Sequence, residues 1–202
     1  AWNSSLCPAG QVTRIDDTYT NLDDRTLEGR DLLIAYSLDT DFGDFRFKLS
    51  GTFYDEMFQE ASGPASLIIA AAAPGGALDA SGVSVPNGFE NLLGTRGQFE
   101  EKFTFSSSYT RGPFLLRLTG TQIGEYKDQD VTNNSSGGSS NEFWPMPSMT
   151  TLNLTLGYKM ESGMRVRLIV TNLEDERAPL NDNIWLADSD VHSDLGRKYT
   201  LE

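Results

Sequence analysis

The residues best suited to ligand chemistry lie near the end of the chain. Asp188, Asp190, His192 and Asp194 alternate within seven positions. Their carboxylates could bind a divalent cation, and the imidazole could titrate near neutral pH. The segment lacks the glycine turn and bidentate glutamate of a calcium-binding loop, so we interpret it as a solvated acidic loop and predict no metal site. Asp188, Asp190 and His192 remain candidates for ligand contact.

Two tryptophans in the long connections, Trp144 and Trp185, are the other candidates for ligand binding. Their rings could stack on a sugar or a chelate, although loop aromatics also serve only to fix loop shape. Five basic residues could attract an anionic ligand or pair with acidic neighbours: Arg46, Lys48, Arg117, Arg165 and Arg167.

Neither catalysis nor nucleic-acid binding is predicted. The chain has one histidine and no nucleophile elbow, phosphate-binding loop or strong metal-ligand spacing, so we expect no catalytic residues and no cofactor. Cys7 is the single cysteine, which excludes a disulfide framework within these residues. The net charge of -13 argues against a nucleic-acid partner, because phosphate contacts need clustered Lys and Arg.

The elements that must position these residues are β-strands. Apolar and polar residues alternate with a period of two, which is typical of strands with one apolar face. The alternation predicts strands over residues 26–38, 45–54, 99–110, 114–126, 149–160 and 164–171, and a final strand over 197–202. The first strand could begin as early as Tyr19.

The connections between these strands alternate in length. Short turns at 39–44, 111–113 and 161–163 alternate with long segments at 55–98, 127–148 and 173–195. Long structureless loops are uncommon in compact soluble domains, whereas outer-membrane barrels combine short periplasmic turns with long extracellular loops. No apolar run approaches the roughly 20 residues of a membrane helix. The apolar run 66–73 is expected to pack against neighbouring loops.

Aromatic residues near the expected strand ends fit the aromatic girdles of a membrane barrel. They are Phe45, Phe53, Tyr54, Tyr109, Phe114, Tyr126 and Tyr158. We therefore predict an all-β chain that forms part of a transmembrane antiparallel β-barrel.

Three stretches carry a resemblance to a known family. Residues 152–180 read LNLTLGYKMESGMRVRLIVTNLEDERAPL, in which Asn172, Leu173, Asp175 and Glu176 match the family's N-L-[FE]-D-E tail, with Glu174 where phenylalanine is usual. Residues 188–202 hold His192, Gly196, Arg197 and Tyr199 in matching places. Upstream, Asn21 precedes the pair Gly29 and Asp31. Together these stretches resemble the C-terminal portion of TonB-dependent outer-membrane receptors over nearly the whole chain.

The resemblance implies a barrel of 22 strands with a plugged lumen, of which residues 1–202 supply the last six or seven. The plug domain and N-terminal strands are absent from this chain, which opens on Ala1 without a signal peptide. We interpret the chain as a piece of a longer polypeptide or a processed one.

The function that the resemblance implies is TonB-dependent uptake of a scarce ligand, such as a siderophore, cobalamin, a glycan or a peptide, across the bacterial outer membrane. The implied partners are the remainder of the receptor, the TonB-ExbB-ExbD complex, lipopolysaccharide and other outer-membrane lipid, and in some cases a surface lipoprotein. A passive outer-membrane porin and a soluble all-β binding module are the alternatives.

Overall fold

The computed structural model describes residues 14, 24–79, 89–95, 98–128, 144–181, 187 and 190–202. Their fold is mainly antiparallel β-structure, which confirms the all-β class predicted from the sequence. The strands of the described residues are β1 (Arg25–Thr40), β2 (Gly43–Gln59), β3 (Glu101–Arg111), β4 (Phe114–Ile123), β5 (Tyr126–Asp128), β6 (Trp144–Met146), β7 (Met149–Lys159), β8 (Arg165–Thr171) and β9 (Lys198–Leu201). One helix, α1 (Gly63–Ala72), lies between β2 and β3.

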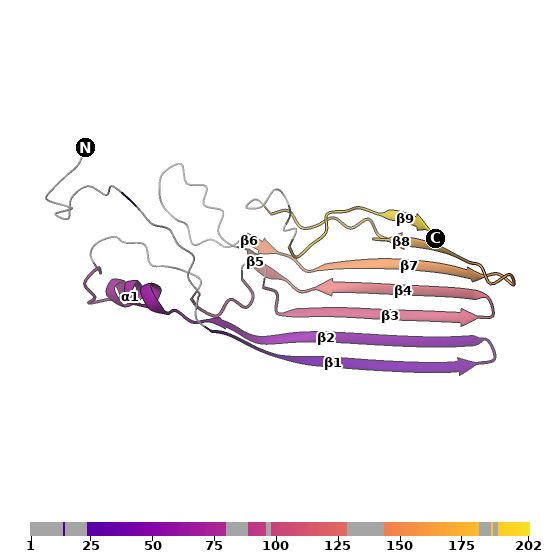
Figure 1. Cartoon of the computed structure of the whole chain (residues 1–202), viewed down its shortest axis with the longest axis horizontal. Helices are drawn as coiled ribbons and strands as arrows, with labels where there is room; N and C mark the ends of the chain where they lie inside the picture. The colour runs from indigo at the N-terminus through magenta and orange to yellow at the C-terminus, as the bar shows by residue number, and fades with distance from the viewer. Residues whose placement is uncertain are drawn as a thin grey trace.

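Seven strands form one sheet in the order β1-β2-β3-β4-β7-β8-β9, and all neighbours are antiparallel. The small sheet of β5 and β6 is separate. β1 and β9 are the edges of the larger sheet, so the described strands form an open sheet and not a closed barrel. Figure 1 shows the strands lying side by side in the order of the chain.

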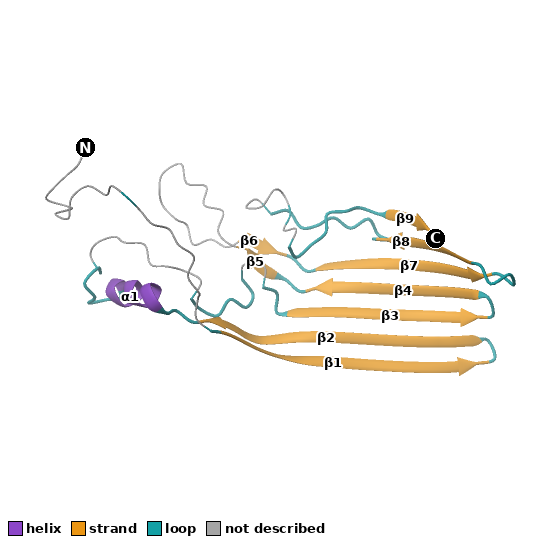
Figure 2. Ribbon diagram, viewed as in Figure 1, coloured by secondary structure: helices purple, strands orange, loops and turns teal. Residues whose placement is uncertain are grey.

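The two ends of the sheet differ as the sequence predicts. The hairpins β1–β2, β3–β4 and β7–β8 close with short turns at one end, which we call the short-turn end. The described parts of the long connections, including α1 and the small sheet, lie at the opposite end, the loop end (Figure 2). Gly112 and Gly163 occupy short turns with φ of 54° and 88°, a conformation that glycine adopts without steric cost.

The strand register separates two faces of the large sheet, because residues directly opposite one another share a face. One row across all seven strands consists of Leu38, Phe45, Tyr109, Leu116, Leu156, Leu168 and Leu201. The adjacent row consists of Ser37, Arg46, Ser108, Arg117, Thr155, Ile169 and Thr200. We call the face of the first row the apolar face and that of the second the polar face.

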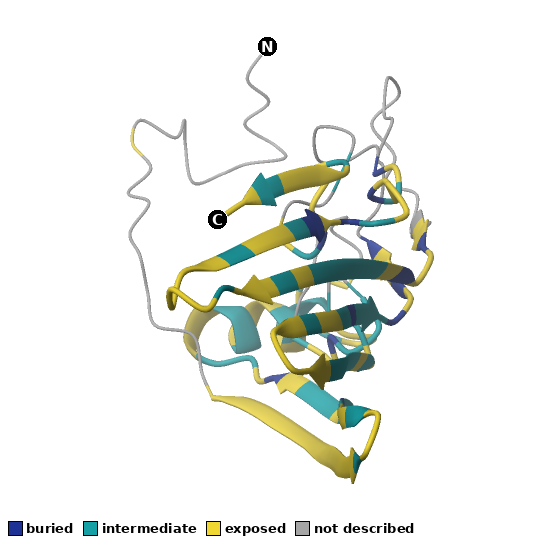
Figure 3. Cartoon of the chain, turned by 90° about the vertical axis from the view of Figure 1, so that its right-hand side faces the viewer, coloured by how far each residue is buried: buried dark blue, intermediate teal, exposed yellow. Residues whose placement is uncertain are grey.

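The apolar face is exposed. Leu38 and Leu116 are 42% and 43% exposed, and Leu201 is 74% exposed. Figure 3 colours β1 as exposed along nearly its whole length. In the described part of the chain, strands of the large sheet contact their ladder neighbours and no second layer covers the apolar face. Large apolar side chains therefore have no packing partner above the sheet.

Two phenylalanines lie flat against the apolar face. A Cβ built on Gly120 would lie 2.0 Å from the Phe105 ring, and one on Gly51 would lie 2.8 Å from the Phe103 ring. These rings occupy the space that side chains at the two glycines would fill, and cross-strand aromatic contacts of this kind help to fix register.

A β-bulge between Glu28 and Gly29 interrupts the β1–β2 ladder at the loop end. Beside it, Arg30 makes a two-pronged contact with Asp55, with nitrogen–oxygen distances of 3.0 and 2.8 Å. The ladder then resumes and extends β2 to Gln59, beyond the end predicted at residue 54. The charged pair Arg30–Asp55 thus lies next to Phe53, the last aromatic residue of β2 on the apolar face toward the loop end.

Three sequence-based expectations need correction. Residues 63–72 form α1, although the stretch 66–73 was expected to be loop. β4 ends at Ile123, and Tyr126 belongs to the small sheet, where it is buried and takes no part in an exposed aromatic girdle. Tyr54 lies opposite Gly29, which the register places on the polar face. The other expected strands are present with ends shifted by a few residues.

Candidate ligand-binding site at the loop end

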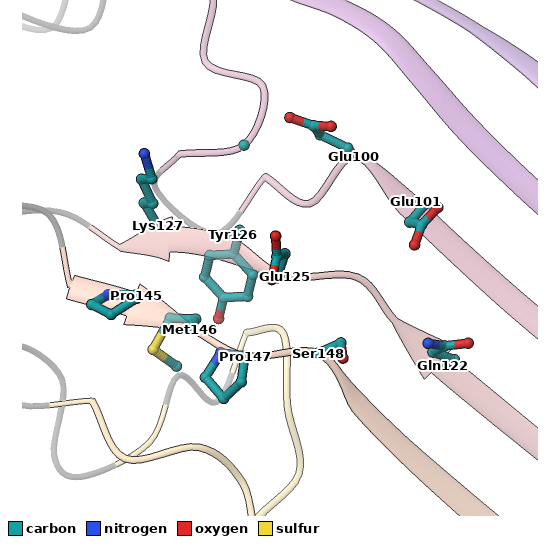
Figure 4. A pocket seen from close by; sticks show the side chains of 11 residues that line it. Glu100, Glu101, Gln122, Glu125, Tyr126, Lys127, Pro145, Met146, Pro147 and Ser148 are labelled. Atoms are coloured by element: carbon teal, nitrogen blue, oxygen red, sulfur yellow. The ribbon is translucent and has the colours of Figure 1, made fainter.

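A hollow of about 740 Å³ opens at the loop end between the large and small sheets. We call it the loop-end hollow (Figure 4). We number the long connections in chain order: the first joins β2 to β3, the second joins β4 to β7, and the third joins β8 to β9. The walls of the hollow come from the first and second connections and from the adjoining ends of β3 and β4: Gly94, Glu100, Glu101, Gln122, Glu125, Tyr126, Lys127, Pro145, Met146, Pro147 and Ser148. Its volume lies within the range of small-molecule sites.

Backbone hydrogen bonds fix the walls of the loop-end hollow. The Lys127 N–H donates to the carbonyl oxygen of Gly94 over 2.8 Å, which joins β5 to the first long connection. The Gly124 N–H donates to the carbonyl oxygen of Glu101 over 2.9 Å, which holds the break after β4 against the start of β3. Three carboxylate-bearing residues are thereby brought around one opening, although they come from two separate parts of the chain.

The chemistry of the loop-end hollow is acidic with an apolar wall. Glu100, Glu101 and Glu125 outnumber the single ammonium group of Lys127. In Figure 4 the Tyr126 ring extends across the hollow toward β6, and Tyr126 pairs with Met146 in the small sheet. This combination suits a ligand that presents hydrogen-bond donors or positive charge together with an apolar part.

The position of the loop-end hollow follows from the register. Gln122 lies opposite Phe103, and Glu101 lies opposite Phe53, so both start from the apolar-face side of the sheet. Both residues lie at the loop end of their strands, beyond the last aromatic residues of the apolar face. The loop-end hollow therefore lies at the edge of the large sheet, next to the long connections.

Buried polar residues pack against the wall of the loop-end hollow and next to it. His192 is 4% exposed, and its ring stacks on Tyr126 with centroids 5.8 Å apart and an interplanar angle of 14°. The buried Asn181 amide donates a hydrogen bond to the Asp128 carboxylate. The second and third long connections are thus packed together, and the first joins them through the bridge between Thr95 and Lys127.

The predicted ligand-binding residues have different placements. His192 contacts Tyr126, a wall of the loop-end hollow, but is itself buried. Asp190 lies in an exposed turn. The backbone of Trp144 pairs with Asp128 in the small sheet, next to the lining residue Pro145. Trp185 and Asp188 lie outside the described residues. Ligand contact by these five residues stays a prediction.

The acidic residues of the loop-end hollow were not among the predicted site residues. Glu100, Glu101 and Glu125 flank expected strand ends next to long connections, and that placement is the signal that could have identified them. Among the described residues, no three His, Cys, Asp or Glu side chains are grouped as a metal site would require. Within the same residues, no helix is long and apolar enough to span a membrane.

A second structured feature, the Asn172 corner, follows β8. Asn172 is 3% exposed and has a φ of 54°, which asparagine tolerates better than most residues. Its side-chain nitrogen donates to the carbonyl oxygens of Glu176 (2.8 Å) and Leu195 (3.1 Å), and its side-chain oxygen accepts from the Glu176 N–H (2.9 Å). Its backbone N–H donates to Asn153 Oδ1 over 2.9 Å.

The Asn172 corner continues through Asp175. Asp175 Oδ1 accepts a hydrogen bond of 2.7 Å from the Arg197 N–H. A Cβ at Gly196 would lie 2.7 Å from the same oxygen, so glycine leaves room for this contact. A hydrogen bond with the Tyr199 side chain raises the pKa of the Arg197 guanidinium. The residues of the N-L-x-D-E tail therefore tie the third long connection to β7 and to the start of β9.

The chain matches no protein-family model, and no curated protein has a significantly similar sequence. Membership of a family therefore remains a proposal that rests on the residues themselves.

Proposed function

We propose that the chain forms part of the wall of a transmembrane antiparallel β-barrel in the bacterial outer membrane. The observation that carries this proposal is the apolar face, which crosses all seven strands and has exposed apolar side chains on every strand except β3, where they are half-buried. A water-soluble sheet buries such a face, and a large exposed apolar surface marks contact with a partner or a membrane. Lipid acyl chains would cover the apolar face, and the polar face would line the lumen.

The dimensions of the apolar face support a membrane-facing role. Phe45–Tyr109 and Phe114–Tyr158 are aromatic pairs at the short-turn end, with ring centroids 4.8 and 5.0 Å apart. Phe53 and Phe103 form a third pair toward the loop end, 5.2 Å apart. Phe45 and Phe53 are eight positions apart on β2, or about 27 Å of strand, which in a tilted strand approaches the height of the apolar band of such barrels.

The transport function rests on the resemblance to TonB-dependent receptors. The N-L-x-D-E tail supports it, because its residues have a defined structural task at the Asn172 corner. The gathering of the long connections at the loop end supports a place for ligand contact on a rigid scaffold. We propose energised uptake of a scarce ligand, with the loop-end hollow among the first contact sites and a 22-stranded barrel as the complete wall.

The first test is the location and size of the natural protein. Membranes would be separated, washed with alkaline carbonate and extracted with detergent, and the intact mass and N-terminal sequence would be determined. We expect an outer-membrane protein several times longer than this chain with a plug domain upstream. A protein that stays in solution without detergent, or one without a plug, would contradict TonB-dependent uptake.

The second test is uptake itself. A strain that lacks the protein would be compared with one that lacks TonB on a panel of ferric siderophores, cobalamin, glycans and peptides. We expect one ligand whose uptake both deletions abolish. Restoration with the double variant Glu101→Gln/Glu125→Gln would then report on the loop-end hollow, with Ser108→Ala on the polar face as control. Uptake that persists without TonB would favour a passive channel.

A further inference from the structure

A hollow of about 270 Å³ opens at the short-turn end of the large sheet, between the β3–β4 turn and the ends of β7 and β8. We call it the cationic hollow, because its walls include Lys159, Arg165 and Arg167 and no carboxylate. Its volume lies just below the roughly 300 Å³ at which pockets for drug-sized ligands begin. The cationic hollow therefore suits a small anion.

The strand register places the charged walls of the cationic hollow on the polar face. One cross-strand row of its walls consists of Thr110, Leu115, Gly157 and Arg167. This row lies two positions along each strand from the row that defines the polar face, and Lys159 and Arg165 form the next row on the same face. A Cβ at Gly157 would lie 3.2 Å from Leu115 Cβ and 3.7 Å from Arg167 Cγ, so apolar groups cover this glycine.

Positive charges at the cationic hollow lie close together. Lys159 and Arg165 are directly opposite each other on the last rung of the β7–β8 ladder, and like charges in this arrangement destabilise a sheet. Arg167 is two positions from Arg165 on the same strand face, or about 7 Å along the strand. The repulsion between these side chains is a cost that a bound anion would remove.

The chain supplies little negative charge to offset this repulsion. Arg167 pairs with Glu202 over 3.1 Å. Among the described residues, Lys159 and Arg165 have no carboxylate partner. Because the chain contains 29 Asp and Glu but only 16 Lys and Arg, an unpaired cation pair without a nearby carboxylate is a local property of this place.

We propose that the cationic hollow binds a phosphate group, which Lys159 and Arg165 contact directly. Arginine donates paired hydrogen bonds to phosphate oxygens, and lysine provides a compact positive charge. The Thr110 hydroxyl in the same walls is a further donor. A phosphate group carries a charge of about -1.5 to -2 at pH 7, so it can neutralise both unpaired cations, whereas one carboxylate neutralises only one. The inference does not depend on the membrane location or on ligand uptake.

The experiment is a calorimetric titration of the natural full-length protein with inorganic phosphate and with glycerol 3-phosphate, at an ionic strength held constant with chloride. We expect saturable binding of one phosphate group per protein. Lys159→Gln/Arg165→Gln should weaken it at least roughly tenfold, because two charge-assisted contacts are lost. The matched control Arg46→Gln/Lys48→Gln removes the same charge from the polar face of β2 and should leave the affinity unchanged.

The two ligands distinguish the source of the phosphate group. Equal affinity would identify free phosphate as sufficient, and tighter binding of glycerol 3-phosphate would identify a phosphate monoester. Absence of saturable binding of either ligand would overturn the inference and leave the proposed membrane location intact.

The variants distinguish a site from general surface charge. An equal loss of affinity in the control variant would overturn the site. If the double variant at Lys159 and Arg165 loses the circular dichroism of a β-sheet, the single variants Lys159→Gln and Arg165→Gln replace it. Full affinity in both single variants would then overturn the proposal.

Discussion

The large sheet and the loop end distribute polar and apolar groups in opposite ways. On the apolar face, leucine, isoleucine and aromatic side chains are exposed on six of the seven strands and half-buried on β3. At the loop end, by contrast, buried residues include Asp128, Asn172, Asn181 and His192. A water-soluble domain normally does the reverse. The difference agrees with the proposal that lipid covers the apolar face, whereas the loop end is held together by hydrogen bonds between buried polar groups.

The test with the largest expected effect places a charge on the apolar face, midway along β1. Ile34→Arg puts a guanidinium where lipid is proposed, and we expect it to lower the free energy of unfolding in bilayers by about 2–4 kcal/mol. Leu33→Arg is the matched control, because Leu33 lies opposite Ser50 on the polar face. It should cost less than about 1 kcal/mol. Equal losses in guanidinium unfolding would remove the distinction between the two faces.

The corresponding test at the loop end removes a buried hydrogen-bonding group. Asn172→Ala deletes three side-chain hydrogen bonds and places alanine at a positive φ, so we expect a loss of about 2–3 kcal/mol. Hydrogen exchange should rise at residues 172–176 and 195–197. Asn153→Ala removes the bond to the Asn172 N–H and should have a smaller effect. Unchanged exchange in Asn172→Ala would show that the corner does not hold the loop.

A third change examines packing within the apolar face. Gly120→Ala adds a methyl group where the Phe105 ring lies, and we expect a loss of about 1–2 kcal/mol from overpacking. Phe105→Leu should relieve the clash, so the double variant should be more stable than the sum of the single effects. Urea unfolding of the four proteins in a double-mutant cycle measures the coupling. Additive effects would show that the ring does not depend on the glycine.

The smallest effect is expected at the short-turn end. The Tyr109 hydroxyl donates a hydrogen bond of 2.5 Å to the carbonyl oxygen of Phe42 in the β1–β2 turn. Tyr109→Phe keeps the ring and deletes this bond, so we expect a loss of about 0.5–1 kcal/mol. Hydrogen exchange confined to the turn would check it. A change spread over β1 and β2 would indicate that the hydroxyl sets the hairpin as a whole.

The sequence predicts the large sheet well, because period-two alternation is a local signal. In residues 152–158, each apolar residue of β7 falls on the face that the pattern assigns to it, and the short turns lie where glycine occurs. The alternation cannot show what surrounds the apolar face, since a soluble sheet would give the same pattern. It also misses the bulge between Glu28 and Gly29, at which β2 contains one residue without a partner in β1, Asp55.

The loop end is less predictable because its contacts join distant residues. Asp128 and Asn181 are 53 positions apart, and no local sequence pattern around either residue indicates that the two make contact. Likewise, the stack of Tyr126 on His192 joins residues from two connections. For α1 the sequence contains one local signal, because proline at the start of an alanine-rich run favours a helix. The run is uniformly apolar, however, and lacks the 3.6-residue periodicity by which an amphipathic helix is recognised.

The order of the large sheet has a consequence for assembly. Each strand pairs only with the next strand of the sheet along the chain, so every ladder closes over one turn or one connection. Local pairings form early, because little chain entropy is lost in closing a short loop. The sheet can therefore grow by whole hairpins, β1–β2, then β3–β4, then β7–β8, and each addition moves the exposed edge forward by two strands. In this scheme the length of each long connection affects the rate at which one hairpin pairs with the next.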